Sequence, residues 1–209
     1  MIKILIADDH AIVREGLKQI LADTSDMLVA GEAGSGQEAV KKVRAGDFSL
    51  VLLDISLPGM SGLDVLKQIK CLKPGLPILI LSMYPEEQYA IRSLRAGASG
   101  YLTKESAPNE LIEAIRRVAQ GRKYITATLA ERIAVDWETE KDRPIHEELS
   151  DREYQVFCLI ASGKAVKEIA EKLSLSVKTV STHRSRILKK MGVENNAQLT
   201  YYAIKHNLV

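Results

Sequence analysis

The sequence predicts an α/β fold, a doubly wound five-stranded parallel sheet, followed by a small all-α domain. Two observations support the sheet: in residues 1–121 short apolar runs alternate with segments of helical periodicity, and the runs are continuously apolar, as in strands buried on both faces. From residue 149 onward only helical periodicity remains, which indicates the all-α part. We therefore expect one domain over 1–121, a linker over 122–148 and a second domain over 149–209.

The apolar runs predict the strands, and the periodic segments between them predict the helices. The runs are too short for helices and are rich in residues that favour strands. The expected strands are Ile2–Ala7, Met27–Ala33, Leu50–Leu53, Ile78–Leu81 and Gly100–Thr103. The expected helices are Ala11–Asp23, Gly36–Ala45, Gly62–Leu72, Glu86–Ala96 and Asn109–Gln120.

The alternating pattern stops after residue 121. Thr126–Val135 fits a short helix, and the charge-rich segment Trp137–Glu148, which contains Pro144, is interpreted as an exposed linker. The segments that follow have helical spacing and are joined by tight turns. They are Asp151–Ala161, Val166–Leu173, Val177–Met191 and Ala197–His206.

The net charge is informative only when it is divided along the chain. The whole chain carries 29 Lys and Arg against 27 Asp and Glu, a formal charge of +2. Residues 1–121 sum to −1, residues 122–149 to −2 and residues 150–209 to +5 (10 basic against 5 acidic). A basic C-terminal module is typical of a domain that binds an anionic partner such as DNA.

Several classes of protein are excluded by the same composition. The longest uncharged stretch, Pro74–Pro85, has 12 residues, whereas a membrane span needs roughly 18. The N-terminus has no signal-peptide pattern. Cys71 and Cys158 match no metal-binding spacing. We expect a cytoplasmic protein with reduced thiols and no contact with a membrane.

Polar side chains follow the predicted strands. Asp8 and Asp9 follow the first strand, Asp54 the third, Ser82 the fourth and Lys104 the fifth. In a doubly wound sheet these carboxyl ends meet at one edge, where ligands bind. Three carboxylates this close stay ionised only beside a cation, and oxygen ligands suit Mg²⁺. A carboxylate beside Mg²⁺ is also a competent nucleophile toward a phosphoryl donor.

Each of these groups also has a simpler interpretation. An Asp at the end of a strand is often only a helix cap or a turn residue. Lys104 by itself would be a solvated lysine, and Ser82 by itself a turn hydroxyl. The site is favoured because all five groups fall at the same edge of the predicted sheet.

Residues 1–121 resemble the receiver domain of bacterial two-component response regulators, which has a flavodoxin-like fold. The resemblance lies in the segments Ile6–His10, Leu53–Gly62, Leu81-Ser82, Ala96–Ala98 and Gly100–Lys104. It implies that Asp54 is the phosphoacceptor. It also implies that Mg²⁺ is held by Asp8, Asp9 and Asp54 together with the backbone carbonyl of Ser56.

The resemblance assigns a switching role to three further residues. Ser82 would move to bond the phosphoryl group, Lys104 would pair with it, and Tyr101 would turn inward as Ser82 moves. For Tyr101 an aromatic on the strand surface is an equally good interpretation. Many receivers have proline after the lysine, in a cis peptide bond, but this chain has Glu105. Because a cis bond before a residue other than proline costs about 3 kcal/mol, the geometry of the Lys104–Glu105 turn stays open.

The segment Val177–Met191 has the pattern of a recognition helix. Ser176 is a good N-cap for it. Its apolar side carries Val177, Val180, Ile187, Leu188 and Met191, with Arg184 as the exception. Its opposite side carries Lys178, Thr182, Ser185 and Lys189, flanked by Ser181 and Arg186. Such a polar, basic face suits the major groove of DNA, although an ordinary amphipathic surface helix is the alternative.

The C-terminal domain resembles the LuxR-type helix-turn-helix. The likeness lies in Leu149–Glu153, Ile160–Lys164, Lys167–Leu173, Ser176–His183 and Ile187–Val193. It implies that DNA is contacted by Lys178, Thr179, Ser181, Thr182, Ser185 and Lys189. It also implies that the last helix, Asn196–Asn207, helps to pair two copies. We expect Arg184 at a DNA phosphate or in an internal ion pair, and Arg186 beside the DNA-facing side.

Two departures from this family pattern affect the DNA-binding domain. Ala165 and Val166 stand where a polar pair is usual, which removes a likely helix cap worth roughly 1 kcal/mol. Ser181 and Ser185 stand where basic residues are common. Readout of the bases is therefore expected to depend more on hydroxyls, DNA shape and water.

A receiver followed by this module is the NarL/FixJ class of response regulator. The sequence thus predicts a transcription regulator that a sensor histidine kinase phosphorylates on Asp54 and that binds double-stranded DNA, as a homodimer when active. It is not an enzyme beyond catalysing its own phosphorylation and dephosphorylation. The alternatives are a scaffold that is never phosphorylated and, more remotely, a Mg²⁺-dependent phosphatase with an aspartyl nucleophile.

Overall fold

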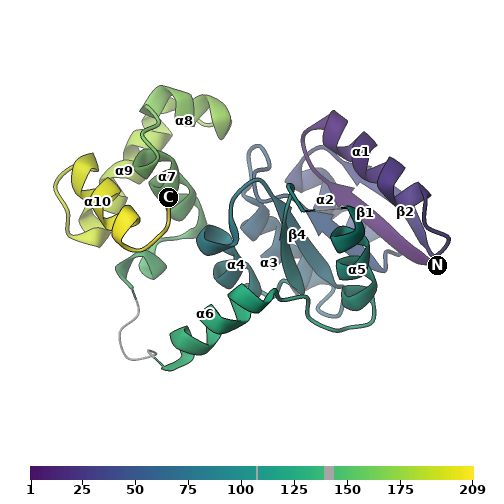
Figure 1. Ribbon diagram of the computed structural model, residues 1–209. Coiled ribbons are helices and arrows are strands. Elements are labelled where there is room, and N and C mark those ends of the chain that lie inside the picture. Colours follow the sequence, from purple (N-terminus) through teal and green to yellow (C-terminus); the bar gives the residue numbers. More distant parts are fainter. Residues whose placement is uncertain (107, 139–143) are drawn as a thin grey trace. The chain divides into compact units, whose positions relative to one another are not determined.

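The computed structural model describes residues 1–106, 108–138 and 144–209. They form two compact units, 1–130 and 131–209 (Figure 1). The part of the expected linker that covers residues 139–143 lies outside the described residues. No helix in the described ranges is long and apolar enough to cross a membrane.

The first unit contains the expected five-stranded parallel sheet, in the order β2-β1-β3-β4-β5. Its strands are β1 (Ile2–Ala7), β2 (Met27–Ala33), β3 (Leu50–Leu53), β4 (Ile78–Ser82) and β5 (Gly100–Thr103). Its helices are α1 (Ala11–Ala22), α2 (Gly36–Ala45), α3 (Gly62–Leu72), α4 (Glu86–Arg95) and α5 (Pro108–Ala119). The strand order reverses between β1 and β3, so the carboxyl ends of these two strands flank the switch point where ligands bind in such sheets.

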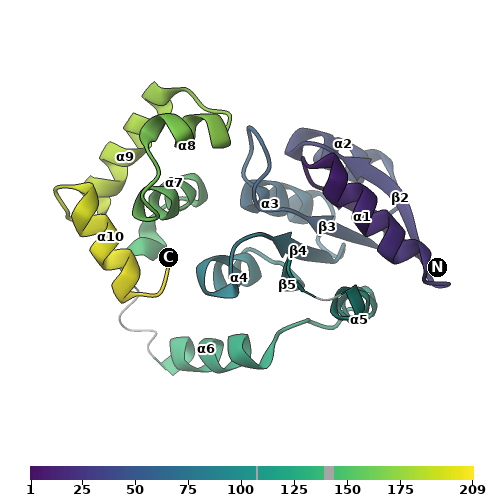
Figure 2. The ribbon, with the colours of Figure 1, turned by 45° about the horizontal axis from the view of Figure 1, so that its top comes forward.

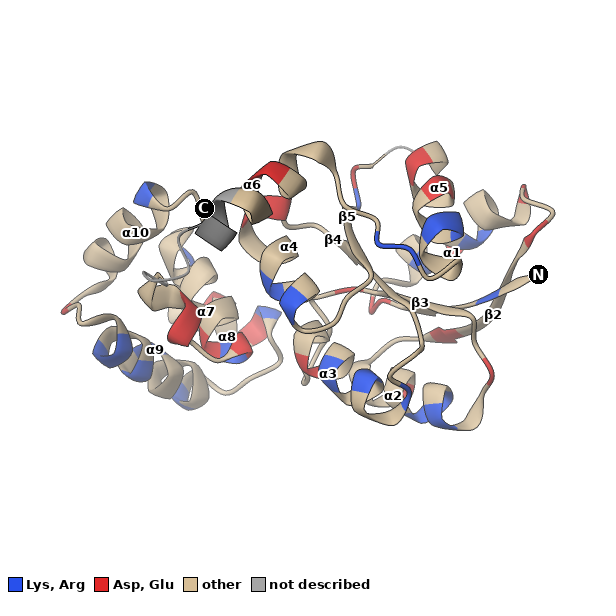
Figure 3. Cartoon of the chain, turned by 90° about the horizontal axis from the view of Figure 1, so that it is seen from below, with Lys and Arg blue, Asp and Glu red and all other residues tan. Residues whose placement is uncertain are grey.

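Helices cover both faces of the sheet, which explains why its central strands are apolar throughout. Figure 3 shows α1 and α5 on one side and α2 and α3 on the other. The core under α1 and α5 contains Ile4 and Ile6 of β1, Leu17 of α1 and Ile115 of α5. All residues of β3 and β4 are buried. A strand buried on both faces has no polar alternation to show, as the sequence predicted.

The chain that leaves α5 returns to the edge of the sheet. Tyr124 forms an isolated parallel bridge with Gly100 of β5, and its N–H donates to the Ser99 carbonyl at 2.9 Å. A Cβ at Gly100 would lie 2.8 Å from the carbonyl oxygen of Tyr124, so this close approach requires glycine. Two residues later the Thr126 hydroxyl donates to Glu86 at the start of α4, at 2.7 Å.

The next helix, α6 (Ala127–Glu138), is longer than expected. Thr126 begins it, because its hydroxyl accepts from the N–H of Leu129. The helix continues through Trp137 and Glu138, three residues past its expected end at Val135. A short 3-10 turn, η1 (Ile145–Glu148), likewise gives regular structure to the end of the segment that we expected to be linker.

The second unit is all-α, as predicted. Its helices are α7 (Asp151–Ala161), α8 (Val166–Lys172), α9 (Val177–Met191) and α10 (Asn196–Lys205). Within this unit α7 lies among the other three helices (Figure 2). Phe157 of α7, Ile187 of α9 and Leu199 of α10 are fully buried. The turn between α8 and α9 passes through Ser174 at φ 52°, a left-handed conformation that is uncommon for a residue with a side chain.

Caps at the helix ends set the length of α9. The Ser176 hydroxyl accepts from the N–H of Thr179 at 3.0 Å, as expected, and Gly192 ends the helix in the left-handed conformation. At the start of α8 Ala165 provides no side-chain cap. The carboxylate of Glu168 instead accepts from the Ala165 N–H at 2.7 Å, so half of a capping box remains.

Candidate functional site: a carboxylate pocket and a basic helix

Two carboxylates share one ammonium group at the switch point of the sheet. Asp8 and Asp54 follow the parallel neighbours β1 and β3, and the Asp54 N–H donates to the Ala7 carbonyl at 2.9 Å. Both side chains are buried. The Nζ atom of Lys104 lies 2.6 Å from Asp8 Oδ2 and 2.8 Å from Asp54 Oδ2. The three groups that the sequence placed after three different strands therefore meet.

Burial and the neighbouring charges act against each other in this pocket. Burial raises the pKa of Asp54 above its ordinary value, although the Lys104 ammonium opposes the shift and Asp8 adds to it. Burial would lower the pKa of Lys104, but Asp54 and Asp8 outweigh it and raise the value instead. Lys104 therefore stays charged. Its single ammonium group is shared by the carboxylates of Asp8 and Asp54.

The backbone around Asp54 is fixed by close contacts with α3. The Ser56 N–H donates to Asp54 Oδ1 at 3.1 Å, and the Gly62 N–H donates to the Ile55 carbonyl at 2.9 Å. A Cβ at Gly62 would collide with the Asp54 carbonyl oxygen and would lie 2.5 Å from the Cα of Ile55. Glycine at the first position of α3 lets the helix approach the backbone of the loop that carries Asp54.

Ser82 is the last residue of β4 and Tyr101 lies within the neighbouring strand β5; both are fully buried. The Ser82 hydroxyl accepts from the Tyr84 N–H at 3.2 Å, and the Tyr101 hydroxyl donates to the Tyr84 carbonyl at 2.7 Å. Burial raises the pKa of Tyr101. The alternative of a surface aromatic is therefore wrong for Tyr101: the ring already points inward and is bonded to the loop after Ser82.

The turn after Lys104 has an ordinary backbone. No peptide bond in the described residues is cis, so Glu105 does not reproduce the cis turn of receivers that have proline. The Lys104 N–H donates to the Ser82 carbonyl at 2.7 Å, and the Ser106 N–H donates to the Thr103 carbonyl at 3.1 Å. These two bonds hold Lys104 at the pocket without a proline.

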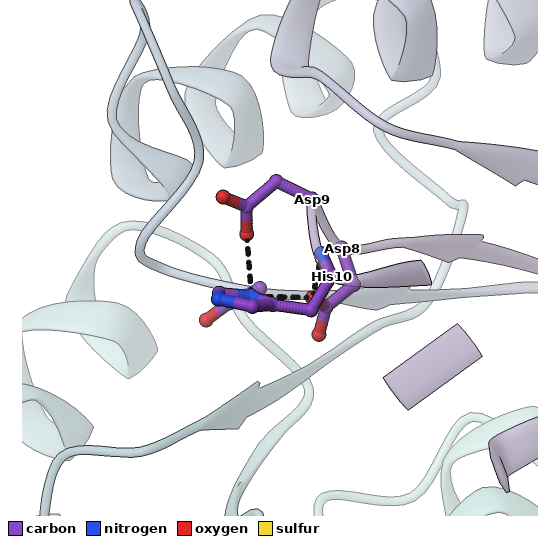
Figure 4. A group of neighbouring side chains, drawn as sticks. Asp8, Asp9 and His10 are labelled. Carbon is purple, nitrogen blue, oxygen red and sulfur yellow. Dashed lines mark hydrogen bonds and ion pairs between the residues drawn. The ribbon is translucent and has the colours of Figure 1, made fainter. Parts of the chain in front are cut away.

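His10 belongs to the same cluster, although no role was predicted for it. One ligand atom from each of Asp8, Asp9, His10 and Asp54 lies within 4.8 Å of the other three. The Nδ1 atom of His10 is 2.8 Å from Asp9 Oδ1 and 3.3 Å from Asp8 Oδ1 (Figure 4). Its place directly after the Asp-Asp pair was the only signal available, because the direction of the ring depends on the fold.

The donor set of this cluster fits a divalent cation. Three carboxylates face a single ammonium group, which leaves uncompensated negative charge, and carboxylate oxygens are the ligands that Mg²⁺ prefers. Asp8 and Asp54 are buried while Asp9 is exposed, so the cluster is open on the Asp9 side.

The second candidate region is the polar side of α9, where basic groups and hydroxyls reach solvent. The exposed residues on this side are Lys178, Ser181, Thr182, Ser185, Arg186 and Lys189. Figure 3 shows the basic residues along α9, whereas acidic residues occur on α7 and α8. Thr179 is half-buried and its hydroxyl is bonded to that of the cap Ser176, at 2.8 Å.

Two hydroxyls on this side are already engaged within the helix. The Thr182 hydroxyl donates to the Lys178 carbonyl at 2.9 Å, and the Ser185 hydroxyl donates to the Ser181 carbonyl at 3.1 Å. A hydroxyl that donates in this way keeps its lone pairs free to accept. Val177, expected on the apolar side, is 51 % exposed, whereas Val180, one turn later, is fully buried.

Arg184 joins α9 to the next helix. Its Nε donates to Asn196 Oδ1 at 2.7 Å, a bond to a neutral amide where we expected an internal ion pair or a DNA phosphate. Lys190 makes the ion pair instead, 2.6 Å from the buried Glu153 of α7. Burial raises the pKa of Glu153, but Lys190 and Ser150 outweigh it and lower the value.

Comparisons with known proteins find one family match over the unit with the carboxylate pocket and another over the unit with α9. Residues 4–116 match the response regulator receiver domain, and residues 147–203 match the luxR family of bacterial regulatory proteins. The chain therefore belongs to the response regulator family and is a two-component response regulator of the NarL/FixJ class with a LuxR-type DNA-binding domain. This is a family of signalling proteins and not of conventional enzymes.

Individual relatives resemble the chain over nearly its whole length. It is 39 % identical to response regulator UvrY of Shigella flexneri, over 100 % of this chain and 96 % of the relative. It is 35 % identical to response regulator GacA of Pseudomonas viridiflava, over 100 % and 98 %. RcsB of Salmonella enterica serovar Typhimurium, solved on the promoter rprA with the phosphomimetic BeF3−, matches with a TM-score of 0.67 and 30 % identity, over 96 % and 97 %.

Proposed function

We propose that Asp54 accepts a phosphoryl group from a sensor histidine kinase and that Mg²⁺ is held by Asp8, Asp9, Asp54 and the backbone carbonyl of Ser56. The observation that carries the proposal is the buried Asp54 carboxylate, which shares the Lys104 ammonium with Asp8 at the switch point of the sheet. Membership of the receiver family supports the same assignment.

In this transfer the carboxylate of Asp54 is the nucleophile. An oxygen of Asp54 attacks the phosphorus of the kinase phosphohistidine, the O–P bond forms as the P–N bond breaks, and the electron pair stays on the imidazole nitrogen. Bound Mg²⁺ supplies neutralisation of charge on the phosphoryl oxygens. Lys104, which already lies 2.8 Å from Asp54 Oδ2, pairs with a phosphoryl oxygen after transfer.

The switch follows from the bonds that converge on Tyr84. Ser82 bonds the phosphoryl group and releases the Tyr84 N–H, while Tyr101 holds the Tyr84 carbonyl. The new charge therefore biases the loop between β4 and α4 toward one of two conformations. The altered surface either frees the DNA-binding domain or favours a dimer.

DNA binding is assigned to the exposed side of α9. Lys178, Arg186 and Lys189 would contact phosphates, and Thr179, Ser181, Thr182 and Ser185 would reach base edges or backbone. Arg184 would add a phosphate contact from the end that is not bonded to Asn196. The similar RcsB structure, solved bound to a promoter, supports DNA binding as such.

A homodimer when active is supported by α10, on which Tyr201 and Ile204 are exposed, and by a solved structure titled as two RcsB dimers on two parallel DNAs. We further infer a cytoplasmic protein from the family. We keep the division into a receiver over 1–121, a linker over 122–148 and a DNA-binding domain over 149–209. The receiver match, 4–116, lies within the first of these, and the luxR match, 147–203, lies within the last apart from residues 147 and 148.

The acceptor is tested by Asp54→Asn, which keeps the shape of the side chain and removes its charge. Incubated with a small phosphodonor and Mg²⁺, the wild type takes up label and the variant does not. Asp47→Asn, at a carboxylate whose side chain is 95 % exposed, is the control and labels normally. Label at the wild-type level in Asp54→Asn would refute the acceptor, and no label in the wild type would favour the scaffold alternative.

The interface is tested by Lys178→Ala and Lys189→Ala. Each should weaken DNA binding and reduce the slope of log affinity against log salt by about 1, the change expected when one phosphate contact is lost. Lys41→Ala, at an exposed lysine on α2, is the control for charge alone. An unchanged affinity and slope in both α9 variants would remove this helix from the interface.

A further inference from the structure

The helix that His10 precedes does not explain its presence. His10 is the N-cap of α1, with extended backbone angles, yet its side chain makes no capping hydrogen bond. Ser, Thr, Asp and Asn are the residues that stabilise this position. Its backbone N–H donates to Asp8 Oδ1 at 2.9 Å, which holds the residue close to the carboxylates.

The imidazole is directed at the carboxylate cluster from the solvent side. Its Nδ1 atom lies 2.8 Å from Asp9 Oδ1 and 3.3 Å from Asp8 Oδ1 (Figure 4), and the side chain is 63 % exposed. One ligand atom of His10 and one from each of the three Asp residues fall within 4.8 Å of one another. The cluster thus contains a nitrogen donor as well as carboxylate oxygens.

We propose that His10 is a nitrogen ligand, through Nδ1, of the divalent cation held by this pocket. This inference rests on the proposed function, because it adds a donor to the same metal site. A site made of carboxylates and a backbone carbonyl suits Mg²⁺, whereas imidazole suits first-row transition ions, whose affinities rise from Mn²⁺ toward Ni²⁺. The receiver of this chain therefore prefers a transition-metal divalent cation to Mg²⁺ at equal concentration.

The ligand is detected directly with Mn²⁺ as the probe and the full chain. Pulsed electron paramagnetic resonance of bound Mn²⁺ should show the coupling of one directly bonded ¹⁴N nucleus in the wild type. His10→Gln should still bind Mn²⁺ but lose this coupling. His206→Gln, which removes a histidine from the other unit, should keep it. Bound Mn²⁺ with no nitrogen coupling in the wild type, or a coupling that survives in His10→Gln, would overturn the assignment.

Titrations with the metal ions alone give a second readout. In His10→Gln the affinity for Ni²⁺ at the pocket should fall at least about tenfold, the lower end of the loss that follows even from removing an outer partner of a ligand. The affinity for Mg²⁺ should change by less than about twofold, because Mg²⁺ takes oxygen ligands. Equal losses for the two ions would contradict a selective role for the ring.

Failure of this inference can be told apart from failure of the proposed metal site. If the wild type binds Mn²⁺ and Asp8→Asn lowers the affinity for Mn²⁺, the carboxylate metal site is supported. The nitrogen coupling alone then decides the role of His10. If neither Mn²⁺ nor Mg²⁺ binds the wild type, the metal site and the inference fail together. Asp8→Asn is informative here because it keeps the volume of the side chain.

Discussion

The carboxylate pocket and the polar side of α9 both use lysine ammonium groups to bind anions, but in opposite surroundings. The Lys104 side chain is 7 % exposed and pairs with carboxylates from residues 8 and 54. Lys178 and Lys189 are exposed and lie on one helix, eleven positions apart in the chain. The pocket therefore depends on groups that follow several strands of the sheet, whereas Lys178 and Lys189 lie on a single helix and pair with no acidic side chain among the described residues.

The comparison predicts that losing a lysine is costly only in the pocket. Lys104→Met should lower the free energy of unfolding by about 3 kcal/mol, because it leaves two buried carboxylates without their cation. Lys178→Met should change it by less than about 0.5 kcal/mol, as is usual for surface substitutions. Urea unfolding in metal-free buffer measures both variants. If both variants lost the same free energy of unfolding, burial of the carboxylates would not make the loss of Lys104 more costly, and the comparison would be wrong.

A second prediction concerns the backbone that carries Asp54. Gly62→Ala should lower the free energy of unfolding by about 2 kcal/mol, as an overpacked core substitution does, since its Cβ meets the backbone of Asp54 and Ile55. Gly16→Ala is the matched control within α1: its Cβ would meet nothing within 4 Å, and it should raise stability by about 0.5–1 kcal/mol. Thermal unfolding followed by circular dichroism distinguishes the two signs, and a stabilised Gly62→Ala would contradict the close contact.

The smallest expected effect concerns His183 on α9. Burial lowers its pKa; Glu153 opposes the shift, and Arg152 and Arg186 add to it. Because the folded protein then binds this proton less readily than the unfolded chain, the stability from neutral His183 is present above about pH 6.5 and is lost as the pH falls below it. Urea midpoints of the wild type should drop more on acidification than those of His183→Leu. If the urea midpoints of the two proteins changed equally with pH, titration of His183 would not contribute to the pH dependence of stability.

Regular structure and the main site residues were predictable from the sequence. The apolar runs located the five strands to within a residue, and the runs are clearest at β3 and β4, which are buried on both faces. The same placement brought Asp8, Asp54 and Lys104 to one edge of the sheet, where their side chains meet. Ser176 was predicted as a cap because capping is a local interaction.

What the sequence could not predict depends on contacts between distant residues. The inward orientation of Tyr101 depends on its hydrogen bond to the Tyr84 carbonyl, in the loop between β4 and α4. Arg184 donates to Asn196, at the start of α10, rather than to an acidic partner, and this depends on where the turn after α9 places that residue. The end of α6 was misjudged because charge-rich composition, as at Trp137–Glu138, does not exclude a helix.

The bridge between Tyr124 and Gly100 has a consequence for how the first unit is isolated. β5 is an edge strand, and in the described part of the chain its outer side is paired only at Gly100, by Tyr124. Open strand edges are templates for aggregation. A fragment cut at residue 121 would lose this cover together with the Thr126–Glu86 bond, whereas one that extends to Ala130 would keep both. Proteolysis between α5 and Tyr124 should therefore turn a well-behaved domain into one that self-associates through β5.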